Sequence, residues 1–352
     1  MKKYSIYDIR GGEILANPIM TSSYQILLSE GTVLQKEYIE NFEQLNISYV
    51  YIYEEKDILN RDIEKARKEA ADYFKTQVKS VLEKHIYSKN NNLQKLSGTA
   101  HGIMDNILKE RKIVEELIEM KQKSEDLYEH SLNCCTLSMI LSLRLNYNNE
   151  IVHAIGVGCL LHDIGLRFMS IKYHNISLSN MPENQRAEYK KHSIYGYSSV
   201  ENENWLHMVS KDIILYHHER MDGTGYPFRK KKVSEPIAIA IVCDVFDEMV
   251  SGIGFEYSKV HKAIEYLKCF RNVKFDAKIV NEFLKVVAAY PVGSHVLTNK
   301  GEIGIVIRQN KGFPERPVLR IVIDRYGRDI CKDNTVDLLK ENSVFIEEVI
   351  ND

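Results

Sequence analysis

The sequence predicts a mainly α protein with a small β-containing unit at each end. Three observations indicate this fold class: helix-period apolar segments recur between residues 124 and 290, short β-branched runs divided by turn residues fill residues 291–352, and similar short runs occupy the first 56 residues. A chain of 352 residues can form two or three domains, and 44% hydrophobic with 27% charged residues is ordinary for a soluble globular protein.

Residues 1–56 are predicted to form a small α/β unit. The runs GGEILANPI and YQILLSEGTVL are separated by turn residues, and the helical stretch KEYIENFEQLN leads into the strand-like SYVYIY. Residues 57–123 are predicted to be a helical connector, because DIEKARKEAADYFKTQVKSVLEKH and HGIMDNILKERKIVEELIEMKQK have apolar residues at helical spacing. The polar stretch SKNNNLQKLSG, residues 88–98, is the expected break between these helices.

Residues 124–290 are predicted to form the helical core, and residues 291–352 a small β unit. The core contains HSLNCCTLSMILSLRL, EIVHAIGVGCLLHDIG, SKDIILYHHE, PIAIAIVCDVFDEMV, SKVHKAIEYLKCF and KIVNEFLKVVAAY. The expected strands of the last unit are VGSHVLT, EIGIVIRQ, PVLRIVID and SVFIEEVI.

Charge and composition limit the expected partners. A net charge of −2 gives no reason to expect DNA or RNA binding. The N-terminus lacks the apolar core of a secretory signal and no stretch reaches 18 uninterrupted apolar residues, so we expect no membrane span. The six cysteines show no CxxC spacing and mostly lie in apolar surroundings, which favours reduced thiols in a cytoplasmic protein.

Several histidines and aspartates of the helical core directly follow apolar runs, where burying them costs several kcal/mol unless a partner compensates. A cluster of metal ions is the economical partner, since imidazole and carboxylate together suit Fe, Mn or Zn. Adjacent residues on one helix differ by about 100° in direction and can reach one site, and this many ligands suits two ions about 3.5–4 Å apart. The candidate ligands are His130, His162, Asp163, His192, His217, His218 and Asp244. A single histidine is more often a hydrogen-bonded residue than a ligand, and we apply that interpretation to the remaining histidines.

The stretch LLHDIG followed by HHERMDGTGYP resembles the HD-GYP family, a branch of the HD metal-dependent phosphohydrolases. The signature HHExxDGxGYP is complete, and the resemblance covers roughly residues 100–290. It implies that residues 124–290 form an HD-type helical bundle and that the seven residues above hold two divalent ions, iron or manganese. It also makes Asp126 a candidate ligand of a third ion, and Asp163 and Asp244 the catalytic carboxylates.

The activity that the resemblance implies is hydrolysis of cyclic di-GMP to pGpG or GMP through a metal-bridged hydroxide. Glu219 would support a ligand histidine. The candidate substrate contacts are Arg167, Asp222, Gly223, Gly225, Tyr226 and Pro227. The Asp-Gly-Thr-Gly turn permits a close approach of the chain to a substrate, and Tyr226 could stack on a base. The alternative role of Gly-Tyr-Pro is a rigid buttress of the loop.

Two departures from the family pattern leave alternatives open. Leu166 stands where HDIGK has lysine, and SGIGFEYSK replaces the arginine-rich segment expected after Asp244. Arg167 or the basic run RKKK at residues 229–232 could supply the missing charge, although such runs are usually solvated loops. The alternatives are therefore a weakly active or inactive receptor or scaffold for cyclic dinucleotides and a phosphodiesterase for another cyclic dinucleotide. A nucleotidase for mononucleotides is disfavoured by the complete signature. The connector and terminal units suggest interaction roles, including a homodimer.

Overall fold

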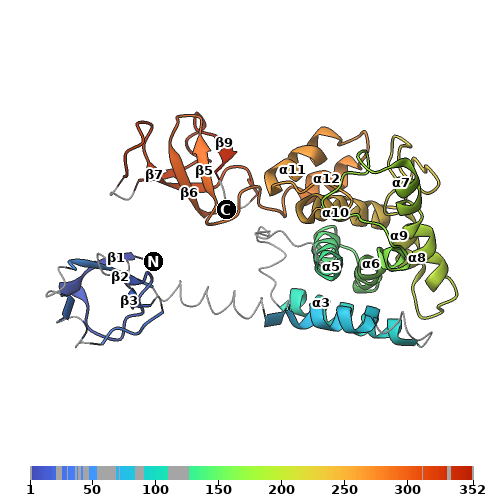
Figure 1. Cartoon of the computed structure of the whole chain (residues 1–352), viewed down its shortest axis with the longest axis horizontal. Coiled ribbons are helices and arrows are strands. Elements are labelled where there is room, and N and C mark those ends of the chain that lie inside the picture. The colour runs from blue at the N-terminus through green and yellow to red at the C-terminus, as the bar shows by residue number, and fades with distance from the viewer. Residues whose placement is uncertain are drawn as a thin grey trace. The chain divides into compact units, whose positions relative to one another are not determined.

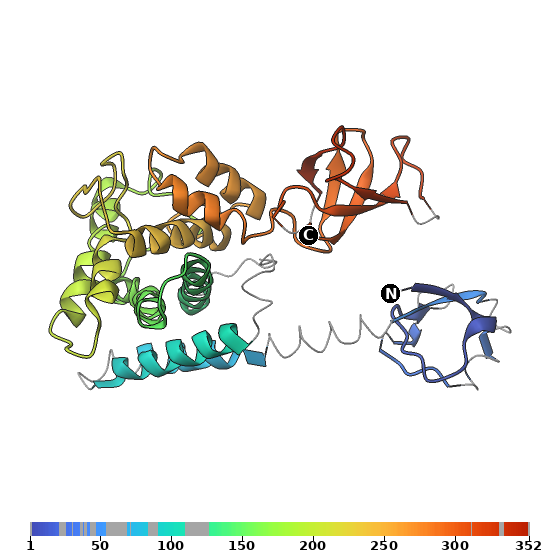
Figure 2. The same cartoon turned by 180° about the vertical axis from the view of Figure 1, so that it is seen from behind.

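The chain divides into two compact units, Met1–Tyr73 and Phe74–Asp352. The computed structural model describes residues 2–20, 26–29, 31–35, 38, 41–42, 47–53, 69–70, 72–83, 91–109, 127–310, 312–330 and 334–350. Figures 1 and 2 show its elements from opposite sides.

The first unit contains two short antiparallel strand pairs. β1 (Lys2–Ser5) pairs with β4 (Tyr49–Ile52), and β2 (Ile19–Met20) pairs with β3 (Ile26–Leu28). Alternate side chains of β4 are buried, because successive residues of a strand point to opposite faces. The β content predicted for this unit is confirmed, while β1 and the 3-10 turn η1 (Ile6–Asp8) were not predicted. Most of the helix expected over residues 36–46 lies outside the described residues.

The second unit begins with helical residues 74–83, followed by η2 (Asn91–Gln94) and α3 (Lys95–Lys109). The predicted polar break at residues 88–98 is therefore too long, because helix α3 already begins at Lys95. Leu93, Leu96 and Ala100 are buried in the main core, so tertiary packing draws this polar stretch into a helix. The predicted connector helix beyond Lys109 lies outside the described residues.

The predicted helical core is confirmed. It contains α5 (Leu127–Arg144), α6 (Asn149–Leu161), η3 (Ile164–Phe168), α7 (Glu183–Tyr189), α8 (His192–Val200), α9 (Met208–Tyr216), α10 (Glu235–Ser251), α11 (Val260–Cys269) and α12 (Ala277–Phe283). α10 packs against α5, α6, α9, α11 and α12, and Figure 2 shows it between α5 and α6 on one side and α11 and α12 on the other. Every residue from Ile237 to Ser251 is buried. The helix ends at Gly252, whose positive φ of 76° suits glycine.

Asn149–Phe168 is long and apolar enough to cross a membrane by length and composition. However, 78% of its most apolar window is buried inside the fold. That burial is what a core helix shows, and α6 packs against α3, α5 and α9.

The C-terminal part is one antiparallel sheet in the order β8-β7-β6-β5-β9. Its strands are β5 (His295–Thr298), β6 (Ile303–Arg308), β7 (Val318–Ile323), β8 (Thr335–Asp337) and β9 (Ile346–Val349). Four of these match the predicted runs, and β8 was not predicted. The core of the sheet unit includes Val296, Val306 and Leu319, which are almost fully buried.

Candidate metal centre

The seven predicted ligands come from separate elements and are all buried. His130 lies on α5 and Asp244 on α10, while His192 is the first residue of α8. None of the seven exceeds 4% exposure. The sequence led us to expect the pairs His162–Asp163 and His217–His218 within helices, and this expectation is wrong. Helix α6 ends at Leu161 and α9 ends at Tyr216, so each pair lies in the turn that follows its helix. Because the backbone turns after each helix, both side chains of a pair can point toward the same group of ligands.

A glycine makes the approach of the HD turn to α8 possible. A Cβ atom on Gly165 would lie 1.9 Å from the carbonyl oxygen of His192 and 2.8 Å from the amide nitrogen of Gly196. Only a residue without a side chain lets η3 pack this closely against α8. This contact sets the distance between Asp163 and His192.

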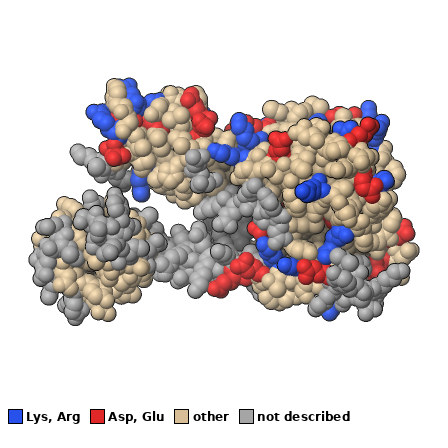
Figure 3. Space-filling model, viewed as in Figure 1, with Lys and Arg blue, Asp and Glu red and all other residues tan. Residues whose placement is uncertain are grey.

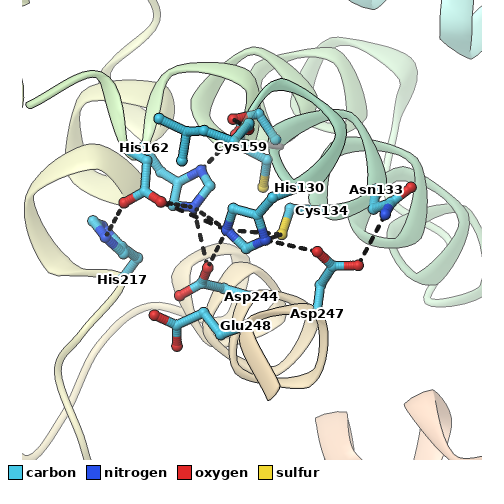
Figure 4. Close-up of polar contacts among 12 residues, drawn as sticks. His130, Asn133, Cys134, Cys159, His162, His217, Asp244, Asp247 and Glu248 are labelled. Carbon is cyan, nitrogen blue, oxygen red and sulfur yellow. Dashed lines mark hydrogen bonds and ion pairs between the residues drawn. The ribbon is translucent and has the colours of Figure 1, made fainter. Parts of the chain in front are cut away.

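The first group of ligand atoms gathers around His130, His162 and Asp244 (Figure 4). Nε2 of His130 lies 3.1 Å from Nε2 of His162, and Oδ1 of Asp244 lies 3.3 Å and 3.1 Å from these two nitrogens. Oδ2 of Asp163 completes the group at 3.6 Å from His130 and 3.5 Å from His162.

The second group contains His192, His217, His218 and the other oxygen of Asp163. Nε2 of His192 lies 3.1 Å from Nε2 of both His217 and His218. Oδ1 of Asp163 lies 3.3 Å from His192 and 3.7 Å from His217. Asp163 thus presents one oxygen to each group, which is the arrangement of a carboxylate that bridges two cations.

The hydrogen bonds of the ring Nδ1 atoms fit a metal centre. Nδ1 of His162 donates to the carbonyl oxygen of Cys159 (2.6 Å), and Nδ1 of His192 donates to that of Tyr189 (2.7 Å). Nδ1 of His217 donates to the carbonyl oxygen of Ile214 (3.0 Å), and Nδ1 of His130 donates to Oδ2 of Asp247 (2.7 Å). These oxygens only accept, so Nδ1 carries the proton and Nε2 keeps its lone pair. Neutral rings whose Nε2 atoms face one another at 3.1 Å, as those of His192 and His217 do, cannot hydrogen-bond. Among the described residues, both buried oxygens of Asp244 lack a hydrogen-bond partner. A cation between these atoms would satisfy all of them, so the residues fit a bound metal.

Burial and charge set the protonation of the centre when no cation is bound. Burial lowers the pKa of His192 to about 4, which leaves its imidazole neutral near pH 7. Burial also opposes a charge on His130, but Cys134 and two neighbouring carboxylates outweigh it and raise the pKa of His130 well above its ordinary value. Burial would raise the pKa of Asp163, but the surrounding imidazoles, His162 first, hold it below its ordinary value.

Three residues near the centre were not predicted from the sequence. Cys134 lies one turn after His130, with Sγ 3.7 Å from its Nδ1, and burial raises the pKa of this thiol well above its ordinary value. Asp247 accepts from His130 and also from the side-chain amide of Asn133 at 3.0 Å. Glu248 groups with His218 and Asp244. The signal for the two acids was their position three and four residues after Asp244 on an otherwise apolar helix.

The acids of the signature hold the loop rather than the ligand rings. The carboxylate of Glu219 accepts from the amides of Phe228 (2.8 Å) and Lys230 (2.7 Å). Asp222 accepts from the amide and hydroxyl of Thr224 in a local turn. Glu219 therefore does not support a ligand histidine directly, because its two oxygens are engaged by the loop backbone.

The backbone of the loop requires glycine at two positions of the signature. Gly223 has a φ of 81°, and a Cβ on Gly225 would lie 2.5 Å from the carbonyl oxygen of His218. Tyr226 is stacked on His218, with ring centroids 4.5 Å apart. The loop therefore forms a wall of the centre, while contact of Gly223, Gly225, Tyr226 and Pro227 with a substrate stays a prediction.

A pocket of about 690 Å³ is lined by residues that lie close in sequence to His130 and Asp163. Its lining includes Tyr128, two residues before His130, together with Arg167, Lys172 and Tyr173. Burial, followed by the charge of Asp163, raises the pKa of Tyr173 to about 12.

Leu166 and Arg167 differ in their surroundings. Leu166 is buried against Met181 and Tyr189. The guanidinium of Arg167 lies 5.5 Å from the ring centroid of Tyr128, and its buried Nη1 has no hydrogen-bond partner among the described residues. Arg167 is therefore available to a ligand of this pocket. The basic run at residues 229–232 is exposed, and Asp126 lies outside the described residues.

Comparison with known proteins identifies two parts of the chain. Residues 112–279 match the family described as HD domain, and residues 295–352 match the family described as KOW domain associated with HD domain. A solved HD-GYP-type protein of Bdellovibrio bacteriovorus, Bd1817, is similar in fold with a TM-score of 0.52 at 18% identity, covering 80% of this chain and 97% of that one.

Curated relatives are similar in sequence over much of the chain. A cyclic di-GMP phosphodiesterase of Pseudomonas aeruginosa is 28% identical over 240 residues, which are 67% of this chain and 57% of the relative. The cyclic di-GMP phosphodiesterase PdeB of Borreliella burgdorferi is 24% identical over 236 residues, 63% of this chain and 59% of the relative. The chain thus spans less than two thirds of the length of these relatives. With its complete signature and its buried histidine and aspartate cluster, the helical part of this chain matches the HD domain and is similar to proteins of the HD-GYP type.

Proposed function

We propose that this protein is a metal-dependent phosphodiesterase that hydrolyses a cyclic dinucleotide, with cyclic di-GMP as the first candidate. The observation that supports this most is the pair of ligand groups joined by the two oxygens of Asp163. The names of the curated relatives support the substrate class. The same residues are proposed to hold two divalent cations, iron or manganese.

The side chains of the centre have separate tasks in this proposal. When bound, two cations supply a nucleophile near neutral pH and neutralise charge on the phosphoryl oxygens. Asp163 keeps the two positions at a fixed distance, and Asp244 offers its two unpartnered oxygens to the same space. The carbonyl acceptors of the Nδ1 atoms hold the rings in one orientation, so the centre needs little rearrangement during the reaction.

The pocket lined by Tyr128, Arg167, Lys172 and Tyr173 is proposed to bind the nucleotide. Its volume of about 690 Å³ falls within the roughly 300–1,000 Å³ typical of ligand sites. Tyr128 and Tyr173 offer aromatic surface for bases, while Arg167 and Lys172 offer charge for phosphates. On the face shown in Figure 3, Lys and Arg are interspersed with Asp and Glu over the helical domain. In this proposal, phosphate recognition depends on these local cations.

The test is a product assay on protein loaded anaerobically with Fe(II) or Mn(II). We expect linear dinucleotide or mononucleotide from cyclic di-GMP, compared with cyclic di-AMP and cyclic GMP-AMP to define the base. Asp163→Asn should reduce turnover to background, while Asp105→Asn, the same change at a partly exposed position of α3 outside the centre, should not alter it. Full activity of Asp163→Asn, or no product from any of these nucleotides, would refute the proposal.

A second candidate is a receptor that binds the nucleotide but turns it over little. It is favoured by Leu166, whose apolar side chain is buried where the family carries lysine. It predicts saturable binding of cyclic di-GMP by the metal-loaded protein with no product after long incubation.

A further inference from the structure

Lys190 is a basic residue beside the metal centre that has no role in the chemistry proposed above. Helix α7 ends at Tyr189, Lys190 follows it, and the ligand His192 begins α8. Two residues of chain span at most about 7 Å, so the backbone of Lys190 lies close to the second ligand group. The side chain of Lys190 is half-buried.

The ammonium group of Lys190 lies against the tyrosine of the signature loop. Its Nζ is 5.4 Å from the ring centroid of Tyr226. That ring stacks on His218, with centroids 4.5 Å apart, and meets His192 edge to face at 6.2 Å. A cation over an aromatic ring at this distance is attracted to it. Tyr226 therefore holds the charge of Lys190 next to two rings of the second ligand group.

The hydrogen-bond donors of this ammonium group are unused. A lysine carries three N–H donors, and within the described part of the chain no acceptor bonds to Nζ of Lys190. The adjacent Lys191 differs, because its Nζ donates to the carboxylate of Glu188 at 2.7 Å. A half-buried cation with three unused donors suits an anionic oxygen of a ligand.

Other positions around the second ligand group offer less charge to a ligand. Nη1 of Arg220 donates to the carbonyl oxygens of His217 and Glu219, so this guanidinium holds the turn of the ligand pair. Leu166 is apolar and is buried with Tyr189, and residues 252–257, which follow α10, contain no lysine or arginine. Compared with these positions, Lys190 offers a full charge whose donors are not bonded to the protein.

We propose that Lys190 binds a non-bridging phosphoryl oxygen of the cyclic dinucleotide at the metal centre. This inference rests on the proposed function and adds a residue to its phosphate site. An ammonium group binds phosphate as a point charge, and its donors stabilise the negative charge that grows on the phosphoryl oxygens during hydrolysis. A cyclic dinucleotide has two phosphates, so Lys190 serves the one at the centre, while Arg167 and Lys172 serve the part of the nucleotide in the pocket.

The first test is the kinetics of Lys190→Met in the full chain loaded with Mn(II). Methionine keeps an unbranched side chain that packs well on the ring of Tyr226, so the change removes the charge alone. We expect kcat/KM for cyclic di-GMP to fall about 10–100-fold, the value of a charged hydrogen bond, and Lys190→Arg to recover most of it. Lys191→Met is the matched control and should leave kcat/KM unchanged, because the adjacent Lys191 is bonded to Glu188.

The second test needs no turnover. Inorganic phosphate is titrated into each manganese-loaded variant by calorimetry, and Lys190→Met should bind it about 10–100-fold more weakly at unchanged manganese content. The proposal is overturned if Lys190→Met keeps the wild-type phosphate affinity or kcat/KM, if Lys191→Met loses as much, or if Lys190→Met loses manganese. A wild type that binds phosphate through Lys190 but hydrolyses no cyclic dinucleotide would refute the proposed function alone.

Discussion

Replacing Gly165 by alanine tests whether the close approach of the HD turn to α8 builds the centre. The added Cβ would lie 1.9 Å from the carbonyl oxygen of His192, so the two segments must separate by more than about 1 Å to reach a permitted contact. The colliding atoms are backbone atoms of α8 and cannot rotate away. Overpacking of this kind costs about 1–3 kcal/mol, and we expect the upper end.

The assay is calorimetric unfolding of metal-loaded and chelated protein. A loss of about 3 kcal/mol corresponds to a fall of roughly 6–12 °C in the melting temperature of a domain of this size. The metal-loaded form should lose more than the chelated form, because separating Asp163 from His192 also weakens cation binding. Gly98→Ala is the control: a Cβ there meets nothing within 4 Å, and alanine within helix α3 should raise stability by about 0.5–1 kcal/mol. A Gly165→Ala protein that melts with the wild type and keeps its metal would refute the reasoning.

Three further predictions follow from the same geometry. Asp247→Ala removes the acceptor of His130 Nδ1 and should weaken one cation about 10–100-fold, measured by metal titration of the chelated protein. Because the raised pKa of His130 leaves a proton competing for Nε2, cation affinity at the first group should increase with pH, and calorimetry in buffers of different ionisation enthalpy should detect proton release. The stability of the metal-free protein should change with pH in the opposite direction. Protonated His130 stabilises the fold fully below about pH 6.5, and this contribution to the free energy of unfolding is lost as pH rises through the folded-state pKa. Arg167→Ala should weaken cyclic dinucleotide binding about 10–100-fold at unchanged metal content, whereas Arg328→Ala in the exposed β7–β8 connection should not.

The pattern of this sequence is sufficient to predict the fold class and the residues of the candidate centre. Polar His and Asp side chains that follow apolar runs, such as VGCLLHD and DIILYHH, are costly to bury, and a cluster of them indicates a shared partner. The signature HHERMDGTGYP then indicates which family the chain resembles. Its glycine at position 225 has a physical reason, because a Cβ there would collide with the backbone of His218. These features depend on residues that are close together in the chain.

The tertiary structure decided which side chains meet. That Asp163 divides its oxygens between two groups depends on α5 and α8, which bring His130 and His192 to it from opposite directions along the chain. The same packing buries Leu166 against Met181 and Tyr189 while both Leu166 and Arg167 line the pocket, where only Arg167 offers a charge. It also directs Asp247 and Glu248 to different partners, because residues three and four positions along a helix from Asp244 face different neighbours. Spacing identifies the chemical groups, but only the packing of distant helices fixes the distances at which they act.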